Sequence, residues 1–174
     1  MAGVFPRVPN KLKRDDPDCG NELPSKALEY RTQKKLVDMA SFRKYNITVW
    51  KISVNGKPDF IIKENVPISE LQKRFGRAVD RKTEVGFHAE MMARDELSKR
   101  PEFSKNQIQV LAIFTERAPC RMMCRPMLEH EHSWIPTYTY VTDHSKLDDQ
   151  TTEEALMMAY GVWKGSQRAE DKTR

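Results

Sequence analysis

Two short stretches of the sequence carry residue types that can hold a metal ion and move a proton. His88 and Glu90 stand two places apart in "VGFHAEMMARDEL", and Cys120 and Cys124 stand four places apart in "ERAPCRMMC". One histidine and two cysteines are the donor count of a catalytic zinc that keeps its fourth position for water. Glu90, left out of that donor set, can take a proton from the water and hand it to a leaving group. The pattern predicts hydrolysis at an amidine-like carbon with loss of ammonia.

The spacing within each pair predicts where its side chains meet. In mid-helix, residues i and i+2 point to nearly opposite sides, but side chains of the first turn lean back toward the helix N-terminus. We therefore expect His88 and Glu90 to open a helix and to converge just beyond its end. We expect a second helix to open at Pro119, which would place the sulfurs of Cys120 and Cys124 on one face.

Two other interpretations of these residues stay open. His88 and Glu90 alone would fit a solvated helix start. A closed structural zinc site would take His130 or His132 as a fourth ligand, and it would leave Glu90 without a role. We expect both of these histidines to be surface residues at a helix end instead, and Cys19 to be a free thiol in an irregular segment.

The segments around these residues form a mixed α/β pattern. Apolar spacing and capping signals predict helices over 25–45, from Ser69, over 88–99 and over 151–164. Runs of β-branched and apolar residues predict strands over 47–54, 59–64, 107–115 and 137–142. Asn55-Gly56 predicts a hairpin between the first two strands. We expect residues 80–86 to form a polar loop, Pro126 to strain the helix from Pro119, and Trp50 to lie in the core. This order indicates a sheet with helices packed on it.

Length, charge and cysteine count limit the class of protein. The chain has 174 residues, 30 Lys+Arg, 25 Asp+Glu and a formal net charge of +5. This length suits one domain, and the excess of positive charge permits a polyanionic partner. We expect a loosely ordered lead-in or junction over 1–24, the domain over 25–164 and a polar tail over 165–174. Three cysteines cannot all pair within the chain and suit a reducing compartment. No apolar run is long enough for a signal peptide or a membrane span, so we expect a soluble chain without a membrane partner.

The motifs resemble those of a known family. His88-Ala89-Glu90 with Pro119-Cys120 and Cys124 resembles the H-x-E…P-C-x-x-C signature of the zinc-dependent nucleobase and nucleoside deaminases. The order of elements over 25–164 resembles their cytidine deaminase-like fold, which implies three layers, with a mixed central sheet and helices on both faces. The resemblance implies Zn2+ as the cofactor, His88, Cys120 and Cys124 as its ligands, and Glu90 as the proton shuttle. Three residues rather than two separate the cysteines here, a spacing that the polynucleotide-editing branches accommodate.

Basic residues flank the expected mouth of this site. They are Arg77, Arg81 and Lys82 before His88, and Arg117, Arg121 and Arg125 around the cysteines. Phosphate contacts from such a rim would hold a nucleic-acid strand while one base enters the pocket. In the resembled family the loop after the fourth strand touches the base and its 5′ neighbour, which makes Tyr140 and His144 candidates for stacking. We expect a nucleic-acid substrate, with single-stranded DNA favoured and RNA as an alternative.

The whole chain resembles the deaminase domains that end bacterial polymorphic toxins. That resemblance implies a domain of a larger secreted toxin, which acts in the cytoplasm of a rival cell and is neutralised by a dedicated immunity protein. The expected function is hydrolytic deamination of cytosine to uracil. The alternatives are a deaminase of free nucleosides, nucleotides or bases, a deaminase of adenosine in RNA, and a non-catalytic zinc-containing binding module. Whether the fold belongs to the parallel or the antiparallel division of the family also stays open.

Overall fold

The computed structural model describes residues 22–117, 119–132, 135, 137–141 and 152–161. Its strands are β1 (Ile47–Val54), β2 (Lys57–Glu64), β3 (Ile108–Arg117) and β4 (Thr137–Val141). Its helices are α1 (Glu22–Gln33), α2 (Met39–Lys44), α3 (Ile68–Phe75), α4 (Arg81–Gly86), α5 (Ala89–Lys99), α6 (Pro101–Ser104), α7 (Cys124–Glu131) and α8 (Thr152–Ala159). No helix in this part of the chain is long and apolar enough to cross a membrane.

The four strands form one mixed sheet in the order β2-β1-β3-β4. β1 is antiparallel to both β2 and β3, whereas β3 and β4 are parallel. The hairpin between β1 and β2 turns at Asn55 and Gly56, whose φ angles of 52° and 80° are both positive, as a tight two-residue hairpin turn requires. The parallel pair needs a crossover, and α7 lies in it. The four expected strands and the hairpin are therefore confirmed.

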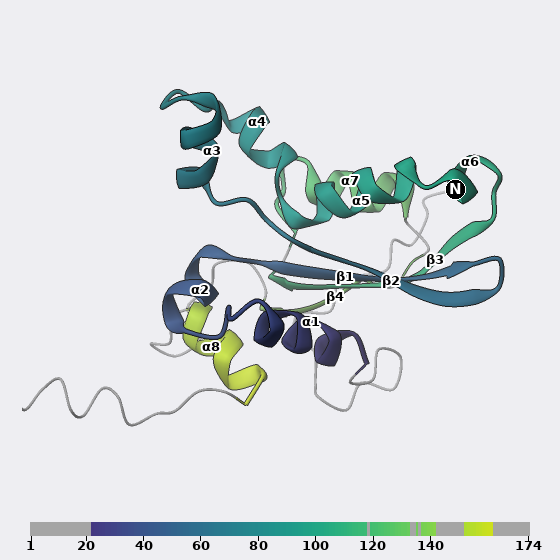
Figure 1. Ribbon diagram of the computed structural model, residues 1–174, viewed down its shortest axis with the longest axis horizontal. Coiled ribbons are helices and arrows are strands. Elements are labelled where there is room, and N and C mark those ends of the chain that lie inside the picture. Colours follow the sequence, from purple (N-terminus) through teal and green to yellow (C-terminus); the bar gives the residue numbers. More distant parts are fainter. Residues whose placement is uncertain (1–21, 118, 133–134, 136, 142–151, 162–174) are drawn as a thin grey trace, which may run out of the picture.

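Helices cover both faces of this sheet, so the fold is α/β in three layers. In Figure 1, α1, α2 and α8 lie on one side of the strands, and α5 and α7 lie on the other. Side chains alternate across β1 accordingly: Ile47 and Val49 pack in the core under α1, α2 and α8, and Trp50 packs in the core under α5 and α7. Trp50 is 0% exposed, which confirms its expected place in the core.

A β-bulge at Leu111 changes which face of the sheet the following side chains of β3 occupy. The register of β1 against β3 shifts between Lys51, which faces Ala112, and Ile52, which faces Val110. The extra residue of a bulge re-aims the side chains that follow it. Ala112 and Phe114 consequently face the core of α1, and Ile113 faces that of α5.

Two segments differ from what the sequence predicts. The segment 25–45 is two helices, α1 and α2, and α1 begins earlier, at Glu22. Residues 80–86, expected to be a loop, form α4, whose first turn is capped by the Asp80 side chain accepting from the Thr83 backbone N–H at 2.7 Å. The sequence of α4 shows no apolar spacing from which a helix could be predicted, because Val85 is its one buried residue.

The segment after β3 also departs from the expectation. No helix opens at Pro119; residues 121–123 form a turn, and α7 begins at Cys124. Pro126 is thus the third residue of α7, where the backbone N–H has no partner within the helix to lose. The prediction that Pro126 would strain the helix is therefore wrong, because a proline is compatible with the first turn of α7.

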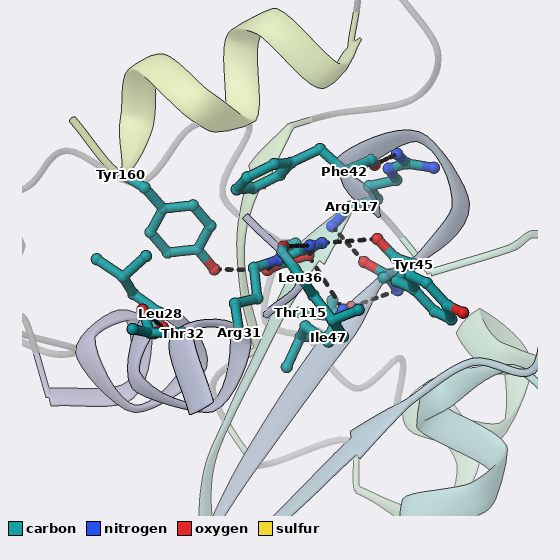
Figure 2. A network of polar contacts seen from close by, with 12 residues as sticks. Leu28, Arg31, Thr32, Leu36, Phe42, Tyr45, Ile47, Thr115, Arg117 and Tyr160 are labelled. Atoms are coloured by element: carbon teal, nitrogen blue, oxygen red, sulfur yellow. Dashed lines mark hydrogen bonds and ion pairs between the residues drawn. The ribbon is translucent and has the colours of Figure 1, made fainter. Parts of the chain in front are cut away.

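A buried ion pair fixes the side of the sheet that faces α1. The Arg31 guanidinium donates to both carboxylate oxygens of Glu116, at 2.7 Å each, and both side chains are fully buried. The Tyr160 hydroxyl and the Ile47 backbone N–H also donate to Glu116, at 2.8 and 3.1 Å. Figure 2 shows Arg31 of α1 and Tyr160, which directly follows α8, converging on the end of β3. A buried pair with every polar group satisfied defines one arrangement of these elements.

Candidate metal centre

His88, Cys120 and Cys124 come together at one end of the sheet. One ligand atom from each of them lies within 4.8 Å of the others, and His88 Nδ1 is 3.5 Å from Cys124 Sγ. His88 is the N-cap of α5, Cys124 is the first residue of α7, and Cys120 lies between the end of β3 and the turn before α7. The convergence predicted from the sequence is confirmed, although Cys120 reaches the cluster from the irregular residues before the turn and not from a helix.

Backbone groups at the start of α7 hold Cys120 in place. The Cys124 N–H points at Cys120 Sγ at 3.4 Å, and the Arg125 N–H donates to the Cys120 carbonyl oxygen at 2.9 Å. These are two of the N–H groups that a helix start leaves without partners inside the helix. Their dipoles favour negative charge on the sulfur.

The protonation of the cluster suits a cation. The hydrogen bond from the Cys124 thiol, followed by that from His88, lowers the pKa of Cys120 to about 3. The same contact and burial raise the pKa of Cys124, and the Cys120 thiolate raises that of His88. One thiolate is therefore present before any metal binds, and the remaining protons are those that a metal displaces. Two thiolates and an imidazole fit zinc, which takes sulfur and nitrogen donors.

Glu90 lies next to this cluster but outside the ligand set. It stands in the first turn of α5 and is 2% exposed. Its charge contributes to the raised pKa of both His88 and Cys124, so it acts on the cluster electrostatically. Its Oε1 accepts hydrogen bonds from Thr115 Oγ1 at 2.6 Å and from Asn46 Nδ2 at 3.2 Å. This burial contradicts the alternative of a solvated helix start.

The two other histidines near α7 do not complete a four-ligand site. Within the described part of the chain, the metal-binding group contains His88, Cys120 and Cys124 and no fourth residue. His130 is exposed, as expected. His132 is half-buried, and its ring meets that of Trp50 edge-on, with the centroids 5.1 Å apart. The expectation of a surface position is wrong for His132, because its ring packs against the buried Trp50.

The stability of the fold is expected to fall below pH 6.5 because of His132. Burial lowers the pKa of His132 from its ordinary value of 6.5; nearby Arg94 lowers it too, while Glu131 raises it. The unfolded chain therefore binds this proton more readily, so the stabilisation by neutral His132 is complete above pH 6.5 and is lost as the pH falls below it. Urea unfolding at pH 7.5, 6.5 and 5.5 should show a shallower loss of stability in His132→Leu than in the wild type. His130→Leu is the matched control, and equal slopes in all three proteins would contradict the assignment.

The structure describes the side chains of four predicted substrate-binding residues, three of which are exposed. Arg81 and Lys82 are exposed on the first turn of α4, which leads directly to His88, and Arg121 is exposed between the two cysteines. Arg117 is partly buried and turns toward α2, where its guanidinium donates to the carbonyl oxygens of Phe42 and Arg43. Those contacts cap the end of α2.

Of the remaining expected residues, two basic ones are described and the others lie partly or wholly outside the described chain. Arg77 and Arg125 are exposed, and Arg125 pairs with Glu129 one turn along α7 at 3.0 Å. The backbone of Tyr140 lies in β4, but its side chain is outside the described residues. His144 and Cys19 are outside them as well, as are the segments 1–21 and 162–174.

Asn46 and Thr115 are site residues that the sequence did not reveal. Asn46 precedes β1, where a polar residue is typical of a chain turn, and Thr115 fits the general preference of strands for β-branched residues. Neither has a motif partner nearby in the sequence, and their contacts with Glu90 arise only when β1, β3 and α5 pack together.

Comparison with known proteins adds no relative: no family model, curated protein or solved structure matches the chain. A functional conclusion therefore depends on the residues of the site itself.

Proposed function

We propose that the chain is a zinc-dependent hydrolytic deaminase that converts cytosine to uracil in nucleic acid, with single-stranded DNA as the favoured substrate. The observation that supports this most is the His88, Cys120 and Cys124 cluster with buried Glu90 beside it and outside the ligand set. A purely structural zinc site gives no reason to place a buried carboxylate there. The target base must leave the stack to reach such a site, which favours single-stranded substrates.

The roles of the residues follow from their chemistry. His88, Cys120 and Cys124 would hold zinc, which when bound lowers the pKa of a water from about 15.7 to about 7. Glu90 takes a proton from the attacking water and passes it to the departing amino group, so that cytosine and water give uracil and ammonia. Burial strengthens the electrostatic action of this carboxylate, and its hydrogen bonds to Thr115 and Asn46 hold it in one orientation.

The proposal includes a cytidine deaminase-like fold. The sheet order β2-β1-β3-β4, His88 and Glu90 at the start of α5, and Pro119-Cys120 directly after β3 support it. The exposed basic residues beside the cluster support a polyanionic substrate. As a domain of a secreted bacterial toxin, the chain would act in the cytoplasm of the target cell and be blocked by an immunity protein; co-purification with the product of a neighbouring gene tests that part.

The substrate class is tested by offering four substrates to the zinc-loaded protein. Single-stranded DNA, double-stranded DNA and RNA are sequenced after incubation, and free cytidine is analysed by chromatography. We expect C-to-T conversion, fastest in single-stranded DNA. Conversion of free cytidine alone would favour the nucleoside deaminase alternative. Adenine read as guanine would show that the pocket takes the other base.

Arg81 and Lys82 are expected to hold the phosphates of the substrate. Both are exposed at the start of α4, whose other end leads to His88. The double substitution Arg81→Glu with Lys82→Glu should raise KM for single-stranded DNA about 10-fold or more and reduce the salt dependence of binding by about two phosphate contacts. The control is Lys57→Glu with Lys105→Glu, which makes the same change of charge at exposed residues beside the β1–β2 turn and before the start of β3, whereas Cys120 follows the end of β3. An equal effect of both double variants would contradict a local contact.

A further inference from the structure

Asn46 lies between the candidate catalytic carboxylate and the strand that precedes the cysteines. Its Nδ2 donates to Glu90 Oε1 and to Thr115 Oγ1, at 3.2 Å each, and the Thr115 hydroxyl donates to the same Glu90 oxygen at 2.6 Å. The three side chains thus form a closed ring of hydrogen bonds. Among the described residues, all of the hydrogen bonds to the Glu90 carboxylate go to Oε1, which leaves Oε2 as the oxygen that can face a substrate.

The orientation of the Asn46 amide is fixed from its other end. Its Oδ1 accepts the backbone N–H of Arg117 at 3.1 Å, so the carbonyl side of the amide faces β3. The NH2 side must then face Glu90, because an amide offers donors only on its nitrogen. An aspartate at this position would keep the bond to Arg117 and would present a second acceptor to the carboxylate.

The peptide groups on both sides of Asn46 are also hydrogen-bonded to buried side chains. Arg31 Nη2 donates to the Tyr45 carbonyl oxygen at 2.7 Å, and the Ile47 N–H donates to Glu116 Oε2 at 3.1 Å. These are the two members of the buried ion pair, and Figure 2 shows the dashed contacts that reach Tyr45 and Ile47. The buried pair on the far face of the sheet therefore anchors the peptide groups that flank Asn46.

A second asparagine completes the anchoring. The Asn46 N–H donates to Asn65 Oδ1 at 2.6 Å, and the Asn65 N–H donates to the Asn46 carbonyl oxygen at 3.2 Å. The Asn65 side chain in turn donates to the Lys44 carbonyl oxygen at 3.1 Å. Each polar group of Asn46 consequently has a partner, so both its backbone and its side-chain amide are held in one orientation.

We propose that Asn46, together with Thr115, is a positioning residue that holds Oε1 of Glu90 and presents Oε2 to the substrate. The inference rests on the proposed function of Glu90 as the proton carrier. A carboxylate held by two donors loses little freedom when the substrate binds, and misplacing a catalytic group by about 1 Å costs up to about 100-fold in rate.

The first test measures the contact without any activity. The side-chain NH2 signals of Asn46 in a 15N-labelled protein are assigned by their absence from the Asn46→Asp spectrum. Glu90→Gln, which replaces a charged acceptor with a neutral one, is expected to move these signals, while signals of the exposed Asn55 stay in place. Unmoved Asn46 signals would overturn the proposal whether or not the protein is a deaminase.

The second test separates kcat from KM. Asn46→Asp should lower kcat about 10–100-fold, with KM changed less than about 3-fold and zinc content unchanged. Asn55→Asp, the same substitution at the exposed hairpin turn, is the control. Where Asn46→Asp does not fold, Thr115→Val and Thr115→Ser give the same answer: the first removes the hydroxyl and should lower kcat about 10-fold, and the second keeps it and should restore most of that loss.

The outcomes distinguish this inference from the proposed function. A folded wild-type protein with bound zinc that converts none of the four substrates would contradict the proposed function, and the NMR result would still decide the contact. An active wild type with equally active Asn46→Asp and Thr115→Val would leave the proposed function intact and overturn the positioning role.

Discussion

Glu90→Gln is expected to lower the rate of deamination about 1000-fold while leaving the fold and the bound zinc in place. The glutamine has the same shape, and its Oε1 can still accept from Thr115 and Asn46, so the surroundings of the side chain are kept. What the variant lacks is an oxygen that can take and return a proton, a contribution of about 10²–10⁴-fold in enzymes. Single-turnover rates of uracil formation measure the effect.

A second glutamate of α5 provides the matched control for this substitution. Glu96 stands on the same helix, is half-buried and pairs with Lys63, away from the cysteines. Glu96→Gln makes the same chemical change and should leave the rate within about 2-fold. An active Glu90→Gln protein would contradict the role of Glu90, and loss of zinc in that variant would show that Glu90 is a ligand instead.

Removal of the metal is expected to lower the midpoint of thermal unfolding by about 10 °C. The ligands come from α5, from the turn after β3 and from α7, so one ion would tie three segments together. A ligand present at about 1000 times its Kd stabilises a fold by about 4 kcal/mol, which for a chain of this size corresponds to about 8–16 °C. Calorimetry before and after chelation, and after zinc is added back, measures the shift.

The cysteine that the proposal leaves out of the site gives the control for the ligands. Cys120→Ser and Cys124→Ser should each lower bound zinc from about one to well below one per chain, and each should unfold near the midpoint of the chelated protein. Cys19→Ser should keep zinc and midpoint unchanged. Because zinc displaces protons from the thiols and the imidazole, zinc affinity should also fall as the pH falls. A midpoint of thermal unfolding that does not change when zinc is chelated would contradict a metal centre.

Local sequence signals were sufficient for the strands and for the cluster. The β-branched runs and Asn55-Gly56 predict β1, β2 and their turn, because strand preference and turn geometry depend on neighbouring residues. The convergence of His88 with Cys120 and Cys124 could be predicted because each segment has a local signal that places it. His88 stands at a helix N-terminus, and the cysteines follow the end of a buried strand.

Signals that depend on distant residues were not visible in the sequence. The Arg31–Glu116 pair joins side chains 85 positions apart, and each alone is typical of a solvated surface. Asn46 and Thr115 likewise acquire their contact with Glu90 only through packing. The prediction of a helix from Pro119 was wrong for a related reason. Pro119 favours a helix start, but the N–H groups of Cys124 and Arg125, at the start of the next helix, hold Cys120 outside any helix.

Titration of zinc into the metal-free protein, with uracil formation in single-stranded DNA followed at each point, tests the central proposal most directly. We expect the rate of uracil formation to rise in proportion to bound zinc and to level off at about one zinc per chain. Uracil formed without zinc would contradict a metal-dependent reaction. A folded protein saturated with zinc that forms no uracil in this substrate would contradict cytosine deamination of single-stranded DNA.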